Sequence, residues 1–295
     1  MMPGTRCSFW ELGAVVRHEK QRHDAGKVRG PLGQRKFRVP SFLTSRDSGL
    51  PAPDDPAALL ADAEASVRRR GWVESDGQLS DQAYEIVSTL VHGESCAFLQ
   101  IGDPGADEVR VMVASHDRLA FRVIMEREDV LIDEIAPSAA WKSLTACLPE
   151  MAPAEGGPVS VSSVTLAEAG AEAEQHRGEQ DRWLAYELRR RDVPAADAEA
   201  IGAFNRMADR TTMQLAVAVR EQDGTMHIGP HAIDMHHAPS GRVAMYPRLP
   251  QGTNTVLGPA EPERVANTAK RYLDQLREQV ADAREQRSDR RGGWV

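Results

Sequence analysis

A short stretch of the chain has the residue types of a metal site: His227, His231, Asp234, His236 and His237. Imidazole and carboxylate groups on neighbouring strands can hold a transition metal. In a strand, successive side chains alternate between the two faces, so His236 and Asp234 share one face while His237 lies on the other. A Gly-Pro pair at 229–230 further separates the first two histidines. A metal site needs convergent ligands with supporting partners, so we expect solvent-facing histidines and no metal here.

Motifs of common enzymes are missing from the rest of the chain. It contains no phosphate-binding loop ending in Lys-Ser/Thr, no GxGxxG dinucleotide-binding unit, no GxSxG elbow and no HExxH helix. The cysteines Cys7, Cys96 and Cys147 are widely spaced, which is typical of a reducing compartment and of buried, inert thiols. We therefore expect a cytoplasmic protein that is not an enzyme and uses no cofactor.

The charge of the chain is distributed unevenly. The 295 residues carry a formal net charge of −8, yet residues 1–36 hold eight basic residues against three acidic ones. The remainder is therefore more acidic than the total, which disfavours nucleic-acid binding, since that binding depends on neutralising phosphates. No stretch approaches the roughly 20 apolar residues of a membrane span. We expect no membrane insertion.

Two segments in the first half carry helix start and stop signals. A capping Asp55 and Pro56 open one helix, which Gly71 ends, and a second helix follows Ser80 and ends at Gly93. An apolar run over 96–101 then leads to alternation over 109–114 and 118–123, and 130–135 supplies a fourth strand, which predicts an antiparallel meander. Pro137 opens another helix.

The second half repeats this order. Helical stretches near 163–177, 181–191 and 195–209 precede strands at 213–219, 225–228, 231–237 and 242–248, and a helix closes the chain over 265–280. We predict an α+β fold with quasi-twofold symmetry, in which a central antiparallel sheet is built from two similar halves flanked by helices. Residues 1–36 are expected to be a disordered basic tail or a mis-annotated start. Residues 37–282 form one domain with halves at 37–149 and 159–282, and 283–295 form a frayed tail.

This pattern resembles the EspG proteins of actinobacterial type VII secretion. The likeness covers roughly residues 38–282 and rests on four stretches: Phe42-Leu43-Thr44 before the first helix, Ile135-Ala136-Pro137 after the first meander, Gly241-Arg242 through Tyr246-Pro247, and Thr253 to Pro259 leading into the helix with Tyr272 and Leu273. The basic segment 1–36 is not part of the family pattern.

The resemblance implies a function and a binding surface. EspG proteins are cytosolic chaperones that bind the hydrophobic tip of the PPE subunit in a PE–PPE heterodimer and keep it soluble for secretion. In the family, the contacts come from the sheet, the C-terminal helical bundle and the loop between the second and third strands, here 102–108. The resemblance therefore points to these candidate partner-binding residues: Asp103, Asp107, Met226, Ile228, Met235 and Met245. Flexible Met side chains suit a surface that adapts to varied apolar tips.

Two other functions remain open from the sequence. One is a small-ligand or metal-binding α+β protein with a pocket between the half-sheets near His227–His237. The other is an interaction module unrelated to secretion. The sequence does not predict the oligomeric state.

Overall fold

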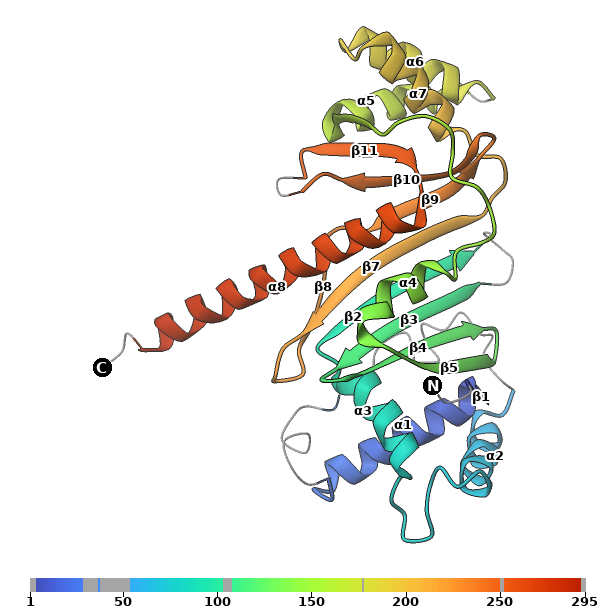
Figure 1. Ribbon diagram of the computed structural model, residues 1–295, viewed down its shortest axis with the longest axis vertical. Helices are drawn as coiled ribbons and strands as arrows, with labels where there is room; N and C mark the ends of the chain where they lie inside the picture. Colours follow the sequence, from blue (N-terminus) through green and yellow to red (C-terminus); the bar gives the residue numbers. More distant parts are fainter. Residues whose placement is uncertain are drawn as a thin grey trace.

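One antiparallel sheet of eleven strands runs through the length of the molecule in the computed structural model (Figure 1). The structure describes residues 4–28, 37, 54–102, 108–176, 178–249 and 252–292, with side chains as far as residue 287. Within this part of the chain, no helix is both long and apolar enough to cross a bilayer.

The first half consists of a strand, three helices, a meander and a short helix. Their bounds are β1 (Thr5–Ser8), α1 (Phe9–Asp24), α2 (Pro56–Arg69), α3 (Asp81–His92), β2 (Ser95–Gly102), β3 (Val109–His116), β4 (Leu119–Glu126), β5 (Asp129–Ile135), the 3₁₀ turn η3 (Pro137–Ala139) and α4 (Ala140–Thr145). The predicted caps are confirmed: the Asp55 side chain accepts hydrogen bonds from the backbone of Ala57 and Ala58, and Ser80 caps α3.

The second half follows a similar element order, with the additional short strand β8 and, in its described residues, no 3₁₀ turn, and ends in a much longer helix. Its bounds are β6 (Val159–Ser162), α5 (Ser163–Ala173), α6 (Gln180–Arg190), α7 (Ala195–Asn205), β7 (Thr212–Arg220), β8 (Met226–Ile228), β9 (Ile233–Ala238), β10 (Gly241–Pro247), β11 (Asn254–Pro259) and α8 (Pro262–Gly292). The prediction of a frayed tail from residue 283 is wrong as far as residue 292, because α8 continues to that point.

The strand order is β1-β5-β4-β3-β2-β7-β9-β10-β11-β6, and β8 lies beside β7. The two half-sheets join where β2 pairs with β7 along its full length. The edge strands β1 and β6 each pair with the last strand of their own meander. Element order and strand order therefore repeat between the halves. A twofold axis relating them in space stays a prediction.

The prediction that residues 1–36 form a disordered tail is wrong for residues 5–24. Ser8 and Glu11 form a capping box that begins α1, and Phe9, Leu12 and Val15 are buried against the sheet. In the repeated topology, β1 and α1 correspond to β6 and α5. The first half therefore begins at Thr5 instead of residue 37. The short edge strand that we expected near 37–43 lies outside the described residues, apart from Phe37.

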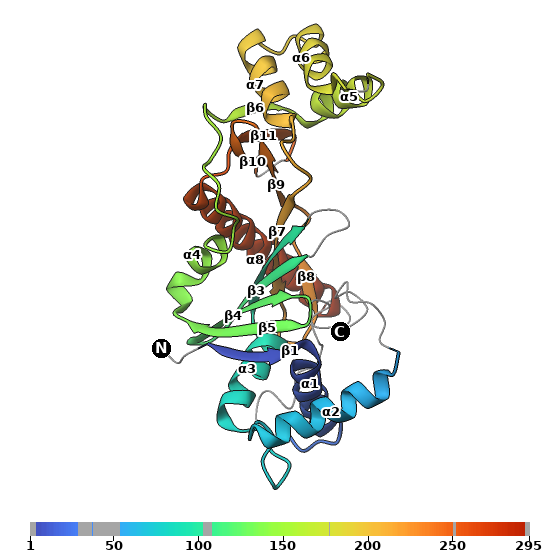
Figure 2. The same ribbon diagram turned by 90° about the vertical axis from the view of Figure 1, so that its right-hand side faces the viewer.

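Helices cover the two faces of the sheet differently (Figure 2). We call one face the bundle face, since α1–α3 pack on it at one end through Cys96, Met112 and Phe121, and α5–α7 pack on it at the other end through Val159 and Val243. The opposite face, the α8 face, is covered by α4 and α8 over apolar side chains that include Leu99, Val111, Leu215, Ile233 and Ala244.

A buried arginine ties the second meander to the segments around it. Arg242 is 3% exposed, and its Nη1 donates to the carbonyl of Pro149 at 2.8 Å. Its Nε and Nη2 donate to the carbonyl of Ala260, just before α8, at 3.3 and 3.2 Å. Burial lowers the pKa of this guanidinium. The Arg242 side chain therefore fixes the chain after α4 and the start of α8 to the same strand.

The N-terminal helix is expected to be part of the folding unit. Leu12→Ala removes a side chain that is 1% exposed, so it should lower the free energy of unfolding by about 2–5 kcal/mol. The same change at Leu59, which is 36% exposed, should cost less than about 1 kcal/mol. Urea denaturation followed by circular dichroism measures both. Equal stability of Leu12→Ala and wild type would show that α1 is not packed on the sheet.

Loss of the Arg242 hydrogen bonds is expected to destabilise the protein. Arg242→Met fills a similar volume but leaves the carbonyls of Pro149 and Ala260 without these donors, which should cost about 1–3 kcal/mol. The matched control Arg189→Met affects a side chain that is 44% exposed and should change stability by about 0.5 kcal/mol or less. Equal melting temperatures for the two variants would contradict this role.

Candidate partner-binding surface

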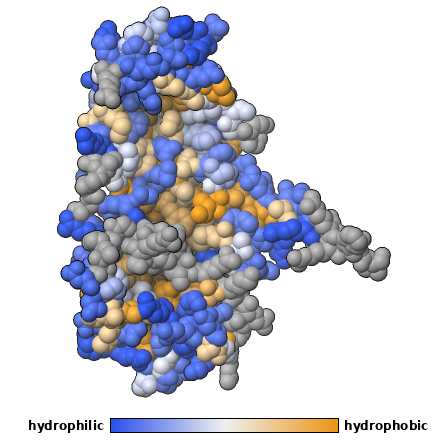
Figure 3. All heavy atoms as spheres, turned by 180° about the vertical axis from the view of Figure 1, so that it is seen from behind, coloured by the Kyte–Doolittle hydropathy of each residue, from blue (hydrophilic) through white to orange (hydrophobic). Residues whose placement is uncertain are grey.

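The middle of the bundle face lies between the two helical bundles. On this face α3 contacts β3 and β4, and α7 contacts β9, β11 and β6. The intervening side chains of β2, β7, β8 and β9 are exposed or half-buried. We call this set the central strip: Phe98, Gln100, Gln214, Ala216, Ile228 and Asp234. In the space-filling view of this face, apolar residues gather in the middle, between mostly polar ends (Figure 3).

The strip is apolar or uncharged over most of its length. Ile228 is 63% exposed, and Phe98 and Ala216 are half-buried. The amide Nε2 of Gln214 donates to Oδ1 of Asp234 across β7 and β9 at 2.8 Å, so the one carboxylate of the strip is held within the sheet. An exposed apolar surface rimmed by polar groups is typical of a protein-interaction site.

The position of Ile228 follows from the geometry of β7. This strand pairs with β9 through its first residues and with β8 through its last. A turn at 222–225 joins β7 to β8, and the backbone N–H of Thr225 donates to the side chain of Asp223. Ile228 faces the small Ala218 across the pair, and the backbone N–H of Gly229 donates to the carbonyl of Val217 at 2.8 Å. The pairing of β8 with β7 therefore places Ile228 on the bundle face.

The predicted methionine surface is only partly found. Met226 is half-buried against the core under α1–α3, and Met245 is half-buried against α5–α7. The prediction that Met235 lines the surface is wrong, because it is 2% exposed and packs in the core under α8. Strand alternation places it opposite Met213, on the α8 face. Asp103 and Asp107 lie outside the described residues.

The four histidines do not converge on one point. His227 Nε2 lies 2.6 Å from Oε1 of Glu221, and His236 Nε2 donates to the carbonyl of Phe204 at 2.6 Å. His237 Nδ1 lies 2.9 Å from Oδ2 of Asp209, and the ring of His231 packs near that of Tyr272. Each histidine therefore has its own neighbour. Burial lowers the pKa of His236, which favours its neutral form.

The sequence did not reveal the loop 206–211 beside the strip. We expected a helix as far as residue 209, but α7 ends at Asn205. The backbone N–H of Ala208 donates to the carbonyl of His237, and the carboxylate of Asp209 accepts from the N–H of Thr211. This loop also exposes Met207, at 46%. The Asp-x-Thr spacing at 209–211 is the local signal that could have predicted a turn.

The same loop leads to the end of β2. Thr212 follows it directly and pairs with Gly102, and the Thr212 hydroxyl donates to the Gly102 carbonyl at 3.3 Å. The end of β2 at Gly102 and residues 206–211 therefore lie at the same end of the central strip.

Buried cysteines add no chemistry to this surface. Burial raises the pKa of the Cys96 thiol to about 11 and that of Cys7 to about 12. Thiolates are the reactive form of cysteine, so both groups are inert near neutral pH.

Comparisons with known proteins agree with the fold. No curated protein matches the chain in sequence. Among solved structures, the chain is similar to the Mycobacterium tuberculosis type VII secretion system chaperone EspG5, solved in complex with the PE25-PPE41 dimer. The TM-score is 0.60 at 16% sequence identity, over 91% of this chain and 95% of that chain. The model of the EspG family matches residues 37–271, so β1 and α1 precede the matched range. The chain belongs to the EspG family.

Proposed function

We propose that this protein is a cytosolic chaperone of a type VII secretion system that binds a PE–PPE heterodimer through its PPE subunit. Membership of the EspG family supports this function, as does the likeness of the fold to EspG5, which was solved with a PE–PPE dimer. In the proposed complex, the apolar tip of the PPE subunit rests on the central strip. Shielding of that tip keeps the heterodimer soluble until secretion, and the protein does no chemistry on it.

The observation that carries the proposal is the central strip itself. Side chains of β2, β7, β8 and β9 form it, and the helical bundles that would otherwise bury them stand at the two ends of the sheet. Interface cores are depleted of charged side chains, and the strip holds one carboxylate that is already bonded to Gln214. An apolar tip would remove the exposed Ile228 side chain from water, while the Gln214 amide supplies a hydrogen bond to Asp234.

We propose that two loops extend this surface at one end. Residues 206–211 bring the exposed Met207 to the edge of the strip, and Met side chains adapt to varied apolar partners. Asp103 and Asp107, in the loop between β2 and β3, are proposed to contact polar groups around the apolar tip.

The binding surface is tested by placing a charge at the centre of the strip. Ile228→Asp should weaken binding to a PE–PPE heterodimer from the same genome by at least about tenfold, because the complex would then bury an unpaired carboxylate. Isothermal titration calorimetry with the purified heterodimer measures the dissociation constant. The melting temperature should stay unchanged, since Ile228 is 63% exposed.

A control variant separates the surface from a general charge effect. Ala283→Asp introduces the same group on an exposed position of α8 and should leave the affinity unchanged. Equal weakening by both variants, or none by Ile228→Asp, would contradict binding through the central strip. If the wild-type chain binds no PE–PPE pair of its genome, the proposed function itself is wrong.

A further inference from the structure

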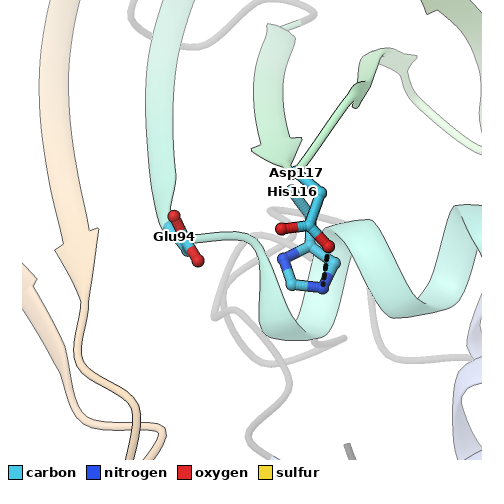
Figure 4. Close-up of side chains that lie close together, drawn as sticks. All are labelled: Glu94, His116 and Asp117. Atoms are coloured by element: carbon cyan, nitrogen blue, oxygen red, sulfur yellow. Dashed lines mark ion pairs between the residues drawn. The ribbon is translucent and has the colours of Figure 1, made fainter.

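A group of three polar side chains lies where β2 begins and β3 ends. This end of the two strands is opposite to the loop 102–108 that joins them. Glu94 directly precedes β2, His116 ends β3, and Asp117 follows it (Figure 4). One potential ligand atom from each of the three side chains lies within 4.8 Å of the others. Within the part of the chain that the structure describes, this is the one such group of three.

The backbone holds these three residues in fixed relative positions. The N–H of Glu94 donates to the carbonyl of Ser115 at 3.0 Å, and its carbonyl accepts from the N–H of Arg220 at 2.9 Å. His116 pairs with Leu119 across a two-residue turn, in which Asp117 has a φ of 52°. The backbone positions of the three residues are therefore fixed by strand pairing, and binding would need only side-chain rotations.

These three side chains form few hydrogen bonds or ion pairs within the described part of the chain. His116 Nε2 lies 3.8 Å from Oδ2 of Asp117, and its buried Nδ1 has no hydrogen-bond partner among the described residues. The carboxylate of Glu94 has no ion pair within that part of the chain, and the Asp117 side chain is 79% exposed. Two carboxylates therefore flank one imidazole with no lysine or arginine bonded to them.

A cavity of about 300 Å³ adjoins the group, between α4, α8 and the sheet. Glu94 and Asp117 line it together with the apolar Trp141 and Leu273 and the charged Lys270, Asp274 and Arg277. A bound cation would therefore be reached by water, which could complete its coordination from the cavity side.

We propose that Glu94, His116 and Asp117 bind one divalent transition-metal ion of the zinc type, which pins the β3–β4 turn to the start of β2. Two carboxylates and an imidazole suit zinc, whereas an all-oxygen set would suit magnesium or calcium. The alternative is that an imidazolium alone pairs with the carboxylates. The site lies at the other end of β2 from the loops proposed to contact the partner, so its failure would leave the proposed function untouched.

Zinc titration of the full, tag-free chain tests the site after treatment with EDTA. Isothermal titration calorimetry should show one Zn²⁺ per chain in the wild type. Glu94→Gln and His116→Ala should each weaken binding at least about tenfold, since each removes a ligand. His231→Ala, which removes a histidine outside the group, should bind as the wild type does. Glu94 is exposed, so Glu94→Gln should stay folded even if His116→Ala does not.

Three results would overturn the metal site. The first is the absence of stoichiometric zinc binding by the wild type, which would leave His116 as an ion-pair partner of Asp117. The second is unchanged affinity in Glu94→Gln. The third is Mg²⁺ binding as tight as Zn²⁺ binding, which would show that the imidazole is not a ligand.

Discussion

The pairing of β2 with β7 is the interaction on which the rest of the structure depends. Ser95–Gly102 runs antiparallel to Thr212–Arg220 along the whole of β2, and this pairing turns two separate meanders into one sheet. Along both strands, successive side chains then alternate between the α8 face and the bundle face. Leu99 and Leu215 are fully buried on the α8 face, whereas Gln100 and Gln214 are exposed on the bundle face. The junction is thus buried on the α8 face, while these two glutamines are exposed on the bundle face.

The exposure of these two glutamines follows from the repeated element order. Each half places its three helices between an edge strand and the first strand of its meander, so the two bundles stand at opposite ends of the sheet (Figure 1). The helices after the meanders, α4 and α8, both cover the other face. The duplicated topology therefore places the described helices at the two ends of the bundle face and not over Gln100, Gln214 and Ile228, and Arg242 fixes the chain segments that lead into and out of the second half.

Local signals in the sequence were sufficient for most elements but failed at the N-terminus. The capping residues Asp55 and Ser80 correctly predicted the starts of α2 and α3, and the alternation of apolar residues predicted strands of the meanders. Helix α1 was missed because its buried face carries acids. Glu11 accepts a hydrogen bond from Ser66 Oγ of α2 at 2.5 Å and forms an ion pair with Arg70, which directly follows α2. The buried Glu19 forms an ion pair with Arg22 of its own helix. The partners of Glu11 are distant in the sequence, and that of Glu19 lies one helical turn away. The buried face of α1 therefore looks polar in the sequence.

The sequence predicted the exposure of some candidate residues correctly and of others wrongly, and their role in binding stays a prediction. Alternation correctly separated His236 from His237, and Ile228 is exposed as expected. Alternation alone does not tell which face the helices cover, so Met235 was assigned to the wrong side. Strand β11 was missed for a different reason, because Gly258 and Pro259 are typical of a turn. Gly258 nevertheless pairs with Ala244 in the sheet, and the position requires glycine because a Cβ there would come within 2.7 Å of Pro158.

Hydrogen–deuterium exchange of the chain with and without the proposed PE–PPE heterodimer tests the central claim most directly. We expect the partner to slow exchange in β8 and in residues 206–211, which border the central strip, while exchange in α4 stays unchanged on the opposite face. Slower exchange confined to α4 and α8, with none along β8, would contradict binding on the bundle face of the sheet.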